Sequence, residues 1–253
     1  MLGLTIASGI ATLTLSRAPV NAISAEWVRR FDAALDEIAD ASVRVLHIRS
    51  DQKVFCAGAD LSEVRARMEA ADGPDRMYAY VAGLQRLYAR IESLPYVTLA
   101  EIGGAAMGGG LELALACDLR VAADEAKLGL PEVRLGLIPG AGGTQRLTRL
   151  CGAGVARRLI LSAEVVDGAA ARSLGIVQWS MPRARLAEGT AEIARSIARL
   201  PAAARAASKS CIAAAARPGR GGYGDELEAT RALMTDTETR ERVTAFLAGT
   251  RLN

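Results

Sequence analysis

The chain has 253 residues, of which 51% are apolar and 23% are charged, and its formal net charge is +3. This length suits one domain with a small appendage, and the apolar fraction can supply a sizeable core. The low net charge and the dispersed basic residues argue against a nucleic-acid-binding protein or a membrane-surface protein. Because no run of about 18 apolar residues occurs, the sequence also predicts no membrane span.

The cysteine and histidine content argues against a metal centre. None of the four cysteines (56, 117, 151 and 211) has C-x-x-C spacing, and His47 is the only histidine. A zinc site built from these residues is therefore not expected. His47 lies in an apolar strand pattern and is interpreted as a packed core residue. The N-terminus lacks the basic and long apolar regions of a signal peptide, so we expect a cytoplasmic protein with reduced thiols.

Up to about residue 185, short strand patterns alternate with helical ones. In chain order, the prediction is strands at 4–7 and 10–15, a helix at 24–39, a strand at 43–49, a helix at 79–94, a strand at 97–102, a helix at 109–117 and a strand at 119–122. This alternation predicts an α/β fold with a covered sheet. The charged stretch 62–76 is interpreted either as a mobile lid or as a solvated surface helix.

The character of the sequence changes after residue 185, where Ala, Arg and Glu dominate and strand patterns stop. Four helices are expected there, at 186–200, 202–216, 225–234 and 236–247. We therefore divide the chain into an α/β core, 1–185, and a helical C-terminal segment, 186–253. These helices carry more apolar surface than a small appendage can bury alone, so we expect them to contact other subunits.

Three glycine-rich segments carry the candidate chemistry. The first, 55–60, follows the strand at 43–49, and its small residues leave N–H groups uncovered for an anionic oxygen. Taken alone, it is also consistent with an ordinary strand-to-helix turn. Asp60 and Glu63 have the spacing of a capping box for a following helix.

The second and third segments each contribute a glutamate. Glycines in 103–112 precede a helix, where free N–H groups and the helix dipole favour negative charge, and Glu112 falls in its first turn. Neither G-x-G-x-x-G nor a Walker A motif occurs there. In 128–145, Glu132 has apolar neighbours, which tend to raise a carboxyl pKa. Either glutamate alone is also consistent with a helix-start residue.

Taken together, the segments resemble the enoyl-CoA hydratase/isomerase (crotonase) superfamily. Its F-x-A-G-A-D turn, G-G-G-x-E helix start and P-E-x-x-x-G-x-x-P-G-x-G-G-T stretch occur in order at 55–60, 108–112 and 131–144. Each motif alone is weak, whereas the ordered set is specific. The resemblance covers nearly the whole chain. It implies a spiral of ββα units with a helical C-terminal segment that helps to build a homotrimer or hexamer.

The resemblance also implies a reaction and its residues. The chain would add water across the C2=C3 bond of a 2-enoyl-CoA, with Glu112 as the base on water and Glu132 as the acid to C2. The N–H groups of Ala57 and Gly109 would form the oxyanion hole. CoA would enter as part of the substrate, with no further cofactor and no metal. The residues expected to contact acyl-CoA are Arg17, Val20, Ala22, Ala57, Gly58, Ala59, Asp60, Gly108, Gly109 and Phe246.

Several alternatives remain open from the sequence. Branched-chain hydratases of the methylglutaconyl-CoA type share the pattern at 110–118, and double-bond isomerases keep one of the two carboxylates. A non-catalytic acyl-CoA-binding or RNA-binding assembly protein is the alternative from another class. The glutamate pair favours a hydratase. One departure concerns the C-terminus, where Gly249 replaces a family lysine that follows the aromatic residue, with Arg251 as a candidate substitute.

Overall fold

A six-stranded sheet forms the centre of the computed structural model, which describes residues 2–39, 42–215 and 222–249. Its strand order is β1-β2-β3-β4-β6-β9. The bounds are β1 Leu2–Ala7, β2 Ile10–Leu15, β3 Val45–Ser50, β4 Val97–Ile102, β6 Leu119–Ala123 and β9 Trp179–Met181. β1 and β2 form an antiparallel hairpin, and every other neighbouring pair is parallel. Parallel pairs need long crossover connections, which the intervening helices supply.

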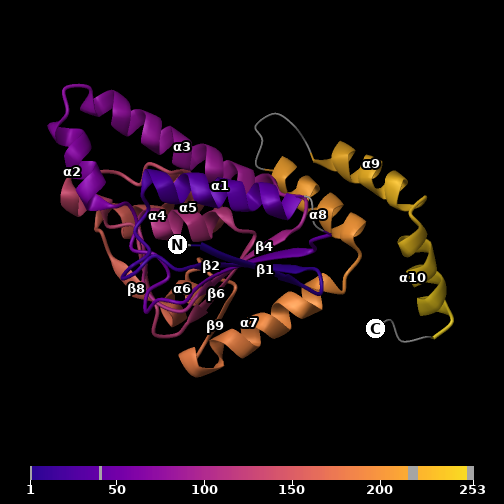
Figure 1. Ribbon diagram of the computed structural model, residues 1–253. Helices are drawn as coiled ribbons and strands as arrows, with labels where there is room; N and C mark the ends of the chain where they lie inside the picture. The colour runs from indigo at the N-terminus through magenta and orange to yellow at the C-terminus, as the bar shows by residue number, and fades with distance from the viewer. Residues whose placement is uncertain (1, 40–41, 216–221, 250–253) are drawn as a thin grey trace.

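Helices cover both faces of this sheet (Figure 1). α1 (Ala25–Ala39) and α3 (Gly73–Ser93) lie on one side, and α7 (Arg183–Ala198) lies on the other. α1 turns an apolar stripe toward the core, and its buried residues are Trp27, Phe31, Leu35 and Ile38. The first four residues of β3 are all buried, as is usual for a parallel strand with both faces covered.

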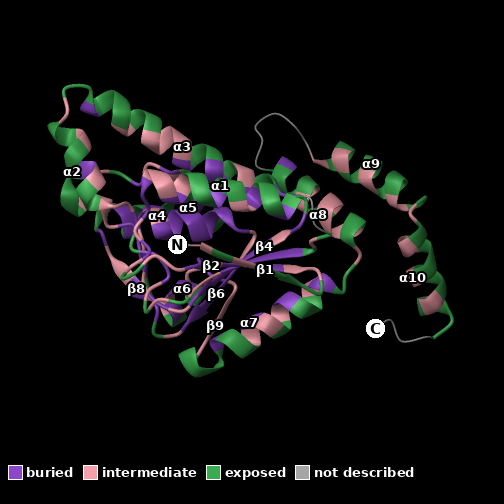
Figure 2. Ribbon diagram, in the orientation of Figure 1, coloured by how far each residue is buried: buried purple, intermediate pink, exposed green. Residues whose placement is uncertain are grey.

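A second, three-stranded sheet lies beside the first and has the order β5-β7-β8. The elements of this region are β5 Ala106–Met107, α4 Gly109–Ala116, β7 Lys127–Gly129, the 3-10 helix η1 Glu132–Leu135, α5 Gly143–Leu161, β8 Val165–Asp167 and α6 Gly168–Ser173. α4 is buried along all of its length except Gly109 (Figure 2). The glutamate in its first turn is therefore held inside the protein.

The stretch 62–76 contains the end of one helix and the start of another. α2 (Leu61–Glu69) is followed by a short break, and α3 begins at Gly73 rather than at the predicted residue 79. Pro74 lies in the first turn of α3, where a missing N–H breaks no helical hydrogen bond. Asp60 caps α2 as expected, but Glu63 does not close a capping box, because its carboxylate accepts a hydrogen bond from the Ala25 N–H (3.2 Å).

The helices after residue 182 differ in how closely they pack on the sheet. α7 packs against β2, β3, β4 and β6, so it belongs to the core. α8 (Ala202–Ala214) is tied to the core by Lys209, whose Nζ donates to Asp118 Oδ2 (2.8 Å) and to the Tyr96 carbonyl (3.1 Å). α9 (Tyr223–Leu233) and α10 (Thr237–Leu247) extend away from the sheet (Figure 1) and contain no buried residue. Contact with the core therefore decreases from α7 through α8 to α9 and α10.

Arg120 is a buried arginine that no sequence pattern predicted. Its side chain on β6 donates to the carbonyls of Ile176 (2.7 Å) and Cys117 (2.6 Å), with a longer bond to Ala114 (3.3 Å). These bonds join the end of α4 to the segment before β9. Burial lowers the pKa of the guanidinium from its ordinary value.

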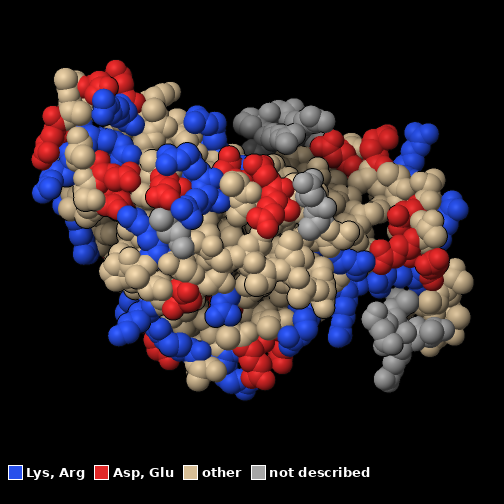
Figure 3. Space-filling model, in the orientation of Figure 1, with Lys and Arg blue, Asp and Glu red and all other residues tan. Residues whose placement is uncertain are grey.

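The surface and the helices show two further features. On the face drawn in Figure 3, basic and acidic side chains are interspersed. Among the residues that the structure describes, no helix is both long enough and apolar enough to cross a membrane.

Candidate active site

Asn21 joins the two N-terminal segments of the site. It is fully buried, and its amide Nδ2 donates to the Phe55 carbonyl (3.0 Å) and to Ser50 Oγ (2.8 Å). Its Oδ1 accepts a hydrogen bond from the Arg17 N–H (2.7 Å). One side chain thus fixes the loop 17–22 against the turn 55–60.

A second link between these segments is ionic. Arg17 Nη2 lies 2.7 Å from Asp60 Oδ2, and the same guanidinium donates to the Ala22 carbonyl. Hydrogen bonds from Ser62 and Arg17 lower the pKa of Asp60 to about 2, so this carboxylate is charged at neutral pH. The structure therefore brings together Arg17, Ala22 and Asp60, three of the residues expected to contact acyl-CoA.

Backbone bonding in the turn 55–60 corrects one predicted role. The Ala57 N–H donates to the Val20 carbonyl (3.0 Å), so it is not free to bind an oxyanion. The Asp60 N–H likewise donates to the Ile23 carbonyl (2.9 Å). Within the described part of the chain, the Ala59 N–H has no hydrogen-bond partner. The Val20 and Ile23 carbonyls take the N–H groups of Ala57 and Asp60, and the Ala59 N–H between them stays unbonded.

The start of α4 supplies a second free donor. Gly109 is the first residue of this helix, and its N–H has no partner among the described residues. An ideal Cβ built on Gly109 would lie 3.8 Å from the Ala59 nitrogen, so the two free N–H groups are neighbours. Gly108 has a φ of +51°, which favours glycine. The positive end of the helix dipole adds to the attraction for an anion.

Glu112 lies one turn further along α4 and is 2% exposed. Its Oε1 accepts a hydrogen bond of 2.7 Å from the Gly143 N–H at the start of α5. Burial raises its pKa to about 7, which the Gly143 hydrogen bond opposes and the charge of Glu132 reinforces. The carboxyl is therefore fixed in position and titrates near neutral pH.

Glu132 reaches the same place from a different element. It begins η1 directly after Pro131, and its Oε1 lies 3.0 Å from an ideal Cβ built on Gly108. Its Oε2 is buried without a hydrogen-bond partner in the described structure. Burial raises the pKa of this carboxyl too. Two neighbouring carboxyls with raised pKa values can hold one proton between them, which is what paired acid and base catalysis needs.

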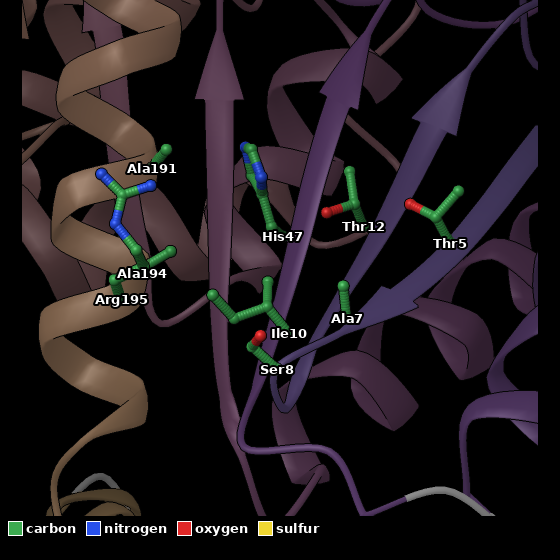
Figure 4. A pocket seen from close by; sticks show the side chains of 9 residues that line it. All are labelled: Thr5, Ala7, Ser8, Ile10, Thr12, His47, Ala191, Ala194 and Arg195. Carbon is green, nitrogen blue, oxygen red and sulfur yellow. The ribbon is translucent and has the colours of Figure 1, made fainter.

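The cavity drawn in Figure 4 is separate from this site. It lies between the β1–β2 hairpin and α7, where the hydroxyls of Thr5 and Thr12 face His47. His47 Nε2 lies 3.0 Å from Glu101 Oε2, and both side chains are buried, which confirms His47 as a packed core residue. Neither Glu112 nor Glu132 lines the cavity. Among the described residues, no group of three or more His, Cys, Asp or Glu is placed to hold a metal ion.

One predicted contact, Phe246, is not brought to the site within one chain. Phe246 lies on α10 and is 74% exposed. Arg251 lies outside the described residues. Two main-chain groups of the site, the Ala59 N–H and the Gly143 N–H, were not predicted from the sequence. Both lie in the motifs at 55–60 and 131–144, and the adjacent glycines at 142–143 are the signal for a close approach.

Comparison with known proteins agrees with this geometry. A family model for enoyl-CoA hydratase/isomerase matches residues 5–250. The mitochondrial methylglutaconyl-CoA hydratase of Mus musculus is 46% identical over 173 residues, which are 67% of this chain and 53% of that protein. A probable mitochondrial enoyl-CoA hydratase 2 of Arabidopsis thaliana is 44% identical over 194 residues, 75% of this chain and 62% of that protein. The matched part of the chain thus spans between one half and two thirds of each relative.

Solved structures extend the likeness to the whole chain. A crystal structure of enoyl-CoA hydratase from Bacillus anthracis superposes with a TM-score of 0.92 at 32% identity, covering 100% of this chain and 98% of the other. A structure from Geobacillus kaustophilus HTA426 gives 0.94 at 34% identity, covering 100% and 95%. The predicted fold class, α/β with a crotonase-like spiral, is confirmed. The chain belongs to the enoyl-CoA hydratase/isomerase family.

Proposed function

We propose that this protein hydrates 2-enoyl-CoA thioesters to 3-hydroxyacyl-CoA. The observation that carries the proposal is that Glu112, in the first turn of α4, and Glu132, whose Oε1 faces Gly108, interact electrostatically beside two N–H groups that have no partner among the described residues. Hydration of a conjugated thioester needs an anion site for the carbonyl oxygen, a base for water and an acid for C2. The site contains a candidate group for each requirement.

The thioester oxygen would accept hydrogen bonds from the Ala59 and Gly109 N–H groups. As water adds at C3, the electrons of the double bond move toward this oxygen, and the two donors stabilise the resulting enolate-like charge. Removing one such donor typically costs about 3–4 kcal/mol of transition-state stabilisation. Ala59 replaces Ala57 in this role, because the Ala57 N–H is already bonded to the Val20 carbonyl.

The two carboxyls would divide the proton transfers. Ionised Glu112 takes a proton from water as the oxygen bonds to C3, and protonated Glu132 gives its proton to C2. One proton is taken up and one is delivered, so the pair ends with its charge unchanged and only water is consumed. In dehydration the roles reverse. The unpartnered Oε2 of Glu132 supports its assignment, because a substrate or water must supply the missing partner.

The remaining predicted residues suit the CoA part of the substrate. Arg17, Val20 and Ala22 lie on the loop that Asn21 fixes beside the turn 55–60. α9 and α10 expose apolar side chains, including Leu227, Val243 and Phe246. Since large exposed apolar surfaces commonly mark subunit contacts, we propose a homotrimer or hexamer in which Phe246 approaches the CoA bound to a neighbour.

The test measures loss of the enoyl absorbance of crotonyl-CoA without added metal or redox cofactor. We expect Glu112→Gln and Glu132→Gln each to lower turnover by about 10²–10⁴-fold, since general acid–base catalysis contributes that much. The double variant should lose less than the product of the single losses, because both residues act on one water. Glu188→Gln is the matched control, since Glu188 is exposed on α7.

Three outcomes distinguish the alternatives. Near wild-type hydration by both single variants would contradict the acid and base assignment. Migration of the double bond without hydration would identify an isomerase. The mouse relative named methylglutaconyl-CoA hydratase supports a branched-chain substrate as the second candidate. A higher kcat/KM for 3-methylglutaconyl-CoA than for crotonyl-CoA would select that candidate.

A further inference from the structure

The loop 138–142 borders the acyl side of the proposed site. It follows η1, which carries Glu132, and it leads into Gly143, whose N–H holds Glu112. In the function proposed above, C3 of the substrate lies beside Glu112, because water activated there adds to C3. The carbons beyond C3 therefore run toward this loop. The inference below rests on that function.

α3 covers the loop in close contact. Gln85 Nε2 donates to the Gly140 carbonyl (2.7 Å). An ideal Cβ built on Gly140 would lie only 3.1 Å from Val81 Cγ1, which is tighter than most real contacts of a Cβ. Val81 and Gln85 are one helical turn apart, so they present the same face of α3 to Gly140. No side chain at position 140 separates the helix from the loop.

Two tyrosines anchor this part of α3. The Tyr80 hydroxyl donates to the Ile23 carbonyl (2.8 Å), and the Tyr88 hydroxyl donates to the Gly109 carbonyl (2.9 Å). Val81 and Gln85 lie between these anchors in the sequence. Moving α3 away from Gly140 would therefore break hydrogen bonds on both sides of the contact. The helix behaves as a fixed wall.

We infer that Val81, packed on Gly140 and held there by the hydrogen bond from the exposed Gln85, closes the acyl end of the site and restricts the substrate to 2-enoyl-CoA thioesters with short acyl chains. Each methylene added beyond the contact must separate Val81 from Gly140 or displace the loop. The loop also positions Glu112 through Gly143, so its displacement would disturb the base. A long chain is thus excluded both by volume and by loss of the catalytic geometry.

The experiment compares kcat/KM for 2-enoyl-CoA substrates with 4, 6, 8 and 10 acyl carbons. One methylene in an apolar pocket is worth about 10–200-fold in specificity, so the wild-type value should fall at least about tenfold from the shortest substrate to the longest. Val81→Ala should reduce this ratio. Gly140→Ala, whose added methyl group meets Val81, should increase it. Tyr78→Ala on the same helix is the control, because Tyr78 is exposed.

Binding of butanoyl-CoA and decanoyl-CoA, measured by calorimetry, tests the wall independently of turnover. Wild type should prefer butanoyl-CoA, and Val81→Ala should reduce that preference. Equal use and equal binding of short and long chains by wild type would overturn the inference, as would an unchanged ratio in Val81→Ala. Failure to hydrate any chain length would instead contradict the proposed function. In that case, the binding preference would still show whether the contact of Val81 with Gly140 limits the length of the acyl chain.

Discussion

Replacing Glu112 by glutamine should stabilise the protein above neutral pH while it removes activity. Burial raises the pKa of this carboxyl from 4.5 in the unfolded chain to about 7 in the folded one. Between these values the folded state binds more protons than the unfolded state, so wild-type stability falls as the pH rises. A shift from 4.5 to about 7 corresponds to about 3 kcal/mol, since each unit contributes about 1.4 kcal/mol. Glutamine does not titrate and keeps an oxygen for the Gly143 N–H.

The assay is urea unfolding of wild type and Glu112→Gln at several pH values between 4 and 9, at one fixed protein concentration. The difference in unfolding free energy should grow in favour of the variant from about pH 4.5 to about pH 7 and then stay constant. Glu188→Gln, at a side chain 64% exposed, should show no such trend. A difference independent of pH, or one that grows as the pH falls, would refute the reasoning.

Four further predictions concern single features. Gly143→Ala places a methyl group 2.9 Å from Glu112 Oε1 and should lower kcat at least about tenfold in steady-state kinetics. Ala59→Pro removes an oxyanion donor and should lower the rate by about 10²–10³-fold; an unchanged rate would exclude that donor. Arg120→Met leaves buried carbonyls without a hydrogen-bond donor and should lower the free energy of unfolding, measured in urea, by about 3 kcal/mol. Light scattering at micromolar concentration should show a trimer or hexamer, and a monomer would contradict that assembly.

The sequence predicted the elements whose hydrophobic period is long and regular. The helix at 24–39 is found at Ala25–Ala39, because Trp27, Phe31 and Leu35 mark one face. The start of α3 was misplaced, because Gly73 and Pro74 suggest a break but also suit a first helical turn. The very short strands β5, β7 and β8 have no period to detect, since they are two or three residues long.

The candidate site likewise contains residues that the sequence predicted and contacts that depend on the tertiary structure. Glu112 and Glu132 were predicted from the ordered family motifs, since either glutamate alone is also consistent with a helix-start residue. The choice between the Ala57 and Ala59 N–H groups depends on which of them meets the Val20 carbonyl, and this is a tertiary contact. The bond from Gly143 to Glu112 joins residues 31 positions apart. Such pairings follow from how α5 docks on α4 and not from local spacing.

In the proposed mechanism, the groups that fix the reacting atoms are main-chain N–H groups, from Ala59, Gly109 and Gly143. A main-chain donor survives every substitution that leaves the backbone in place, with proline as the exception. Mutations in this region therefore change the chemistry mainly through the side chains at 112 and 132, while the anion site persists. A lineage starting from this scaffold can exchange one carboxyl and reach a different reaction on the same thioester in few steps.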